Sequence, residues 1–201
     1  MTKMYGLNTT VTTVNQDNLA SLAKEYGVPL SDWFGLDSSF FYFFDSFDRE
    51  IYREFIRDHS QPLRVLYFDK SGYAVSFHTN CYAGGFPNLK WNRYGVFNTF
   101  VPQTQAPIDS LLTRDTLLSF LQPTLYSKEI NFSEYDYLAV VFWGSFMGRQ
   151  SRRLIRTVQQ NAKLAPENLQ VRIIYVNLDN FFIYETTRTK NSEAVLQVDE
   201  N

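Results

Sequence analysis

The sequence has few of the residues on which common redox and metal sites depend. Among its 201 residues there is one cysteine, Cys81, so neither an internal disulfide nor a two-cysteine redox motif can form. The two histidines, His59 and His78, are well apart in the sequence and predict no zinc cluster. We therefore expect no metal and no cofactor.

An excess of charge of one sign and long apolar runs are also lacking. Lys and Arg total 19 against 21 for Asp and Glu, which argues against a general nucleic-acid binder. The longest apolar run, Tyr137–Trp143, is far shorter than the ~20 residues that a transmembrane helix needs. Apolar residues make up 44% of the chain instead, so it can bury a sizeable core and is not disordered.

The pattern predicts one domain between two polar ends. Residues 1–16 have one charge, little apolar periodicity and no apolar signal-peptide core, as is typical of a flexible tail. Residues 17–186 are expected to form a single α/β domain, and residues 187–201 a polar C-terminal tail.

The N-terminal part is expected to contain helices followed by a ββα unit at 63–121. Two β-rich runs flank the turn-prone segment Asp69–Gly72 and predict a hairpin. Thr113 predicts the N-cap of the next helix. The expected helices are 17–26, about 47–58 and 113–121, and the expected strands are 63–68, 73–77 and a short one at 95–101.

The C-terminal part predicts a βαβ unit at 137–178. Residues 137–143 are continuously apolar, as in a strand buried on both faces, and 171–178 (VRIIYVNL) are expected to form a second buried strand. The helical pattern at 147–164 lies between them, so the two strands are expected to be parallel. A final short strand is expected at 181–186.

The stretch Val140–Gln150, VVFWGSFMGRQ, resembles the active-site motif "VxFWAxWCGPC" of the thioredoxin superfamily. It is most similar to the envelope thiol reductases and the peroxiredoxin-like members. Val176–Asp179, VNLD, resembles the end of their next strand, "VNxD", so the resemblance covers about residues 137–180. The resemblance implies a thioredoxin-like fold.

The motif departs from the family at the residues that perform its chemistry. Met147 and Gln150 stand where the family has its two cysteines, and Arg149 stands where it has proline. Disulfide exchange needs a thiolate to attack and a second thiol to resolve, which a thioether and a carboxamide cannot supply. The resemblance therefore implies a redox-inactive member. It favours the bacterial envelope, either periplasmic or lipid-anchored after signal removal, over the cytoplasm.

The order of the two units also departs from the family. Residues 62–75 are similar to the family hairpin "PTxFLIDKDGKIV", and residues 113–121 are similar to its last helix, "SKEELLAFL". In the family these elements follow the βαβ unit, whereas here they precede it. Two hypotheses fit this order: a circular permutation of the thioredoxin arrangement, or an N-terminal α+β extension unrelated to that hairpin.

Four arginines share one face of the predicted helix at 147–164. Arg149, Arg152, Arg153 and Arg156 have the spacing i, i+3, i+4, i+7, and no acid occurs between Asp136 and Glu167. Arg149 also lies near the helix N-terminus, where anions are favoured. The face either binds an acidic partner, a phosphate or a carboxylate, or is solvated and paired with acids from elsewhere, such as those at 32–58.

We expect no catalytic residue, and a protein- or peptide-binding or structural role for the chain. The expected partner-binding surface consists of Trp143, Phe146, Met147, Arg149, Arg152, Arg153 and Arg156. One alternative is a single-cysteine thiol enzyme in which His78 activates Cys81. Another is a glycan- or peptide-binding module that uses the aromatic and basic loop 86–94, with Trp91 and Tyr94.

Overall fold

The computed structural model of the chain describes residues 6–8, 11–85, 88–131 and 134–187. These residues form one mixed sheet of six strands in the order β3-β2-β5-β6-β1-β4. The strands are β1 (Trp33–Leu36), β2 (Arg64–Asp69), β3 (Ala74–Thr79), β4 (Leu121–Pro123), β5 (Tyr137–Trp143) and β6 (Val171–Asn177).

The pairing of the strands is that of a thioredoxin-like α/β core. β5 and β6 are parallel and are connected by the helix α7 (Arg149–Ala162), which confirms the predicted βαβ unit. The β2–β3 hairpin pairs antiparallel with the free side of β5, so this earlier part of the chain belongs to the same sheet. β1 continues the parallel part beside β6, and β4 is an antiparallel edge strand.

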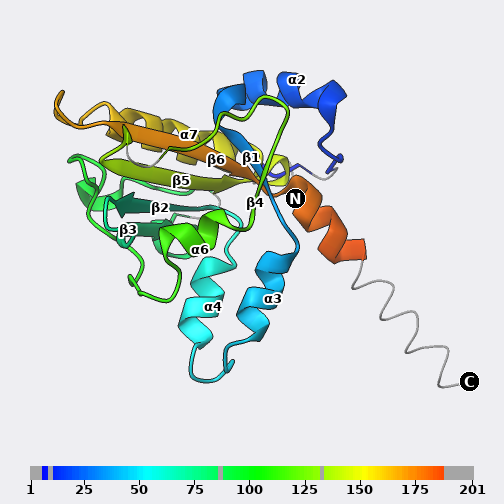
Figure 1. Cartoon of the computed structure of the whole chain (residues 1–201), viewed down its shortest axis with the longest axis horizontal. Coiled ribbons are helices and arrows are strands. Elements are labelled where there is room, and N and C mark those ends of the chain that lie inside the picture. The colour runs from blue at the N-terminus through cyan, green and yellow to red at the C-terminus, as the bar shows by residue number, and fades with distance from the viewer. Residues whose placement is uncertain (1–5, 9–10, 86–87, 132–133, 188–201) are drawn as a thin grey trace, which may run out of the picture.

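Helices cover both faces of the sheet (Figure 1). On one face lie α7 and α2 (Gln16–Tyr26), and on the other lie the shorter helices α3, α4 and α6. The bounds of these three are Ser39–Asp45, Arg53–His59 and Arg114–Leu118. Thr113 caps α6 by accepting the amide of Thr116, as predicted. The short helix α5 (Asn80–Ala83) follows β3.

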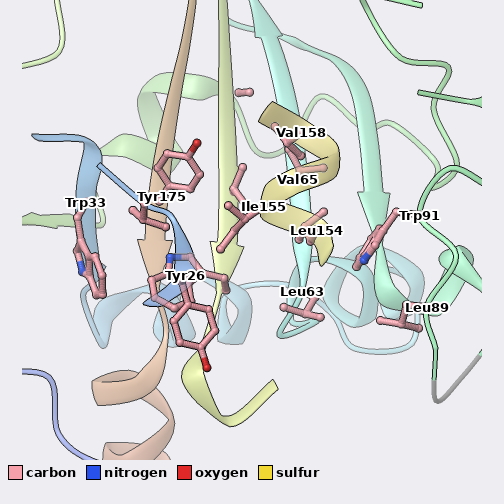
Figure 2. Packing of buried hydrophobic residues seen from close by; sticks show 14 of the residues in the cluster. Tyr26, Trp33, Leu63, Val65, Leu89, Trp91, Leu154, Ile155, Val158 and Tyr175 are labelled. Atoms are coloured by element: carbon pink, nitrogen blue, oxygen red, sulfur yellow. The ribbon is translucent and has the colours of Figure 1, made fainter. Parts of the chain in front are cut away.

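The core on the α7 face is built from alternate strand residues and the apolar faces of the two helices (Figure 2). Val65 and Tyr175 lie on the strands beside Leu154, Ile155 and Val158 of α7, and Trp33 belongs to the same core, where it meets Trp143 edge to face at 4.9 Å. Trp91 and Leu89 close one side of this core from the loop that follows α5. The alternation of strand side chains explains why β5, which has apolar residues at every position, supplies both cores.

The core on the opposite face is rich in phenylalanine. Phe40 and Phe44 of α3 meet edge to face at 4.8 Å between ring centroids, and Phe44 packs on Phe55 of α4 at 5.6 Å. Phe142 of β5 and Phe77 of β3 extend this layer across the sheet. Such edge-to-face pairs contribute ~0.5–1.5 kcal/mol each beyond the area that they bury.

Several elements differ from expectation. Residues 95–101 form turns rather than a strand, and residues 179–187 are helical rather than a strand. Both sides of β6 are already paired, so a strand at 181–186 would have no neighbour there. The helix expected from about residue 47 begins only at Arg53, because the Asp48 carboxylate accepts the amides of Glu50 and Ile51 and turns the chain.

Within the part of the chain that the structure describes, no helix is long and apolar enough to cross a membrane.

His78 of β3 is predicted to make the protein less stable in mild acid. Its Nδ1 lies 3.0 Å from the Gln105 side-chain oxygen and its Nε2 lies 2.9 Å from the Ser76 hydroxyl, and a neutral ring that donates to Gln105 and accepts from Ser76 satisfies both contacts. Burial lowers the pKa of His78 from 6.5 to about 4. The unfolded chain therefore takes up a proton first as the pH falls below 6.5, which favours unfolding.

Between about pH 7 and about pH 5, this effect should remove about 2 kcal/mol from the free energy of unfolding. His78→Gln keeps polar groups in place but has no proton to gain, so its loss over the same interval should be smaller by about that amount. Urea unfolding of both proteins at the two pH values measures the difference. Equal losses in the two proteins would contradict the assignment to His78.

Candidate partner-binding site

The stretch that resembles the thioredoxin motif forms the corner between β5 and α7. After Trp143 the chain makes a single 3-10 turn, η4 (Ser145–Met147), and enters α7 through Gly148. The buried carboxylate of Asp179 accepts the amide N–H of Ser145 at 2.7 Å and the side-chain N–H of Asn177 at 3.0 Å. Burial raises the pKa of Asp179, and these donors oppose that rise by stabilising its charged form.

The two positions that correspond to the family cysteines have packing roles. Met147 is half-buried and packs against the core on the α7 face. Gln150 is fully buried, and its Oε1 accepts the amide N–H of Leu89 at 3.2 Å. The carboxamide at position 150 therefore ties the loop that carries Leu89 and Trp91 to the start of α7. This role requires a hydrogen-bond acceptor.

The prediction that Trp143 lies at the binding surface is wrong. Its side chain is 0% exposed and lies between Tyr26 and Trp33, with ring centroids 4.7 and 4.9 Å away. A bulky ring at the end of a strand that is covered on both faces contributes to the core instead. Phe146, by contrast, is partly exposed and stacks on Phe182 at 4.5 Å. The surface of the corner consequently consists of Phe146, Met147 and Arg149.

The arginine face of α7 exists, and one of its members is paired. Arg152 bonds to Glu25 of α2 at 2.8 Å and lies over the Tyr26 ring at 5.3 Å. No ion pair within the described part of the chain involves Arg149, Arg153 or Arg156. The acids at 32–58, the alternative partners of this face, do not pair with Arg149, Arg153 or Arg156. The face therefore carries three positive charges that no described carboxylate neutralises.

Part of the segment expected to be a flexible tail lies on this corner. The amide N–H of Asn8 donates to the Phe146 carbonyl at 3.0 Å, and the Asn8 side chain donates to the Ser145 carbonyl at 2.6 Å. The Gly6 carbonyl accepts the amide N–H of Arg149 at 3.1 Å. Gly148 has a φ of 48°, and the Gly6 carbonyl occupies the place that a Cβ of residue 148 would take.

The alternative thiol site is not assembled. His78 is fully buried and uses both ring nitrogens on Ser76 and Gln105, so neither is left to activate Cys81. Cys81 is exposed on α5, and partial burial raises the pKa of its thiol. Among the described residues, no group of His, Cys, Asp or Glu is placed to hold a metal ion.

The aromatic loop is divided between the core and the surface. Trp91 is 2% exposed and belongs to the core on the α7 face, so it cannot stack on a ligand. Tyr94 is 85% exposed, and Arg93 lies over its ring at 4.6 Å. Residues 86 and 87, which also belong to this predicted module, lie outside the described residues. One exposed ring in the described part of the loop makes a weak platform.

Two features of the structure were not expected from the sequence. The contacts of Gly6 and Asn8 join residues about 140 positions apart, and neither residue carries a motif. A groove of about 520 Å³ also lies near the start of β6 and includes Asp32 and Arg172. Arg172 pairs with Asp32 and donates to Tyr135 at 3.0 Å, so its charge is already neutralised within the fold.

The chain is an α/β protein whose mixed six-stranded sheet is consistent with a thioredoxin-like core, and its corner between β5 and α7 has no cysteine. Comparisons with protein-family models, with curated proteins and with solved structures found no match. The function of the chain is therefore inferred from the residues of the corner and of α7.

The raised pKa of the Cys81 thiol predicts slow alkylation. At neutral pH the thiol should be protonated to a greater extent than in a free cysteine, and iodoacetamide should react with it more slowly than with glutathione. The rate should rise with pH without a plateau in the acidic range. A fast reaction already in mild acid would show an activated thiolate and would restore the enzyme hypothesis.

Proposed function

We propose that this chain is a redox-inactive, thioredoxin-like protein that binds an acidic protein or peptide. The proposed binding surface is formed by Phe146, Met147 and Arg149 at the corner, together with Arg152, Arg153 and Arg156 on the outer face of α7. The observation that carries the proposal is that Arg149, Arg153 and Arg156 form no ion pair with a described residue.

The composition of α7 supports this use of its charges. A solvated surface helix usually carries both signs of charge, with i,i+4 pairs that stabilise the helix. α7 has four arginines and no acid, so its own charges repel one another. A carboxylate-rich partner removes that repulsion, and several exposed charges together steer its approach. The proposed location is the bacterial envelope, on the basis of the resemblance to envelope thiol reductases.

The lack of thiol–disulfide activity is testable with insulin reduction. The wild-type chain should reduce insulin with dithiothreitol no faster than dithiothreitol alone, because the motif has no thiol. Cys81→Ser should behave identically, because Cys81 is on α5 and not at the corner. A rate above that of Cys81→Ser would show that Cys81 supports redox chemistry and would contradict the proposal.

Charge reversal tests the arginine face. Arg153→Glu with Arg156→Glu should weaken the binding of a labelled glutamate-rich peptide by about tenfold or more, because each exposed attraction of ~0.2–1 kcal/mol becomes a repulsion. The matched control is Arg49→Glu with Arg53→Glu, which changes the net charge equally in the turn before α4 and at the first residue of α4, on the other face of the sheet.

Fluorescence anisotropy at low and at high salt measures the affinities of these variants. The wild-type affinity should fall as salt rises, and the control should bind like the wild type. Equal weakening in both double variants would mean that net charge alone attracts the peptide. That result, or no effect of reversal at Arg153 and Arg156, would refute this face as the binding surface.

A further inference from the structure

The corner between β5 and α7 offers a short edge of backbone to another chain. The carbonyl groups of Ser145 and Phe146 and the amide N–H of Arg149 lie side by side on it, and all three bond to the segment 6–8. Two of these three bonds join backbone to backbone. A peptide of other sequence can therefore make the same two bonds, provided that its backbone has the same shape.

Two positions of the segment determine which sequences fit. At position 6 the φ is +67°, and an added Cβ would lie 3.0 Å from Nε of Arg149, so glycine is favoured. At position 8 the asparagine side chain donates to the Ser145 carbonyl at 2.6 Å and reaches the Tyr26 hydroxyl at 3.5 Å. Leu7 between them is half-buried. The corner thus selects Gly-x-Asn.

Residues 6–8 are bound to the corner weakly enough to dissociate from it. Asn8 is exposed, and the segment is joined to the corner by a few hydrogen bonds, each with a net contribution of ~0.5–1.5 kcal/mol. Segments with so few contacts open locally at a small fraction of the global free energy of unfolding. α2 is capped independently by Asn15 and Asn18, so its start does not need the contacts of residues 6–8.

We infer that residues 6–8 are a displaceable internal ligand of the corner, and that the partner is a peptide with a Gly-x-Asn segment that replaces them. This inference rests on the proposed function, in which the corner is part of the docking surface. It specifies the kind of partner, and it adds that this partner must compete with residues 6–8 for the corner. Because the partner binds only while residues 6–8 are released, its apparent Kd is the intrinsic Kd divided by the released fraction.

The test uses the full-length chain and a labelled peptide of residues 1–12 (MTKMYGLNTTVT). Asn8→Ala removes the side-chain bonds of the internal segment, so this variant should bind the peptide about tenfold more tightly than the wild-type chain. Thr12→Ala, at an exposed position four residues after Asn8, is the matched control and should bind like the wild type. A peptide with Asn8→Ala should bind the Asn8→Ala chain about tenfold more weakly than the unchanged peptide does.

Hydrogen exchange supplies a second readout that does not depend on the peptide. The amide of Arg149 is bonded to Gly6 in the wild-type chain and should exchange about tenfold faster in Asn8→Ala, while amides within β5 should not change. The inference requires both results. Unchanged exchange at Arg149, or no gain in peptide affinity, overturns it.

These outcomes are distinct from those of the proposed function. The peptide of residues 1–12 contains a lysine and no acid, so reversal of Arg153 and Arg156 to glutamate should not weaken its binding. If the glutamate-rich peptide fails to bind while this peptide binds Asn8→Ala, the acidic partner is refuted and the Gly-x-Asn site stands. If the reverse holds, the arginine face stands and the internal ligand is refuted.

Discussion

The position of the whole corner depends on one buried carboxylate. Asp179 follows β6, yet it accepts hydrogen bonds from the start of η4, which follows β5. A buried charge is tolerated only while its donors stay in place, so the ends of these two parallel strands are held in a fixed relation. This fixed relation determines where the chain leaves β5 after Trp143, where it turns at Gly148 and where α7 starts.

The parts of the fold that were predicted are those in which the local pattern and the final environment agree. β5 is continuously apolar, and β6 has the apolar run Ile173–Val176, because each strand is paired on both sides and covered on both faces. α7 has one apolar and one charged face because one face lies on the sheet. A strand was predicted at 181–186 because the aromatic residues there favour β structure, whereas these residues belong to the helix at 179–187 and their place in the fold offers no strand to pair with.

The candidate site was predictable to a smaller extent. Helical spacing correctly placed the four arginines on one face, since that follows from the geometry of a single element. The burial of Trp143 depends on Tyr26 and Trp33, which come from other elements. A local sequence pattern does not show contacts between residues of different elements. The contact of Asn8 with the corner spans most of the chain, and the spacing of residues carries no sign of it.

The corner also brings the two ends of the described chain to the same place. Gly6 and Asn8 lie on η4 from one side, and Phe182, from the helix at 179–187, stacks on Phe146 from the other. Neither end contributes a strand to the sheet. Removal of either end would therefore alter the proposed docking surface at the corner and leave the strands of the sheet intact.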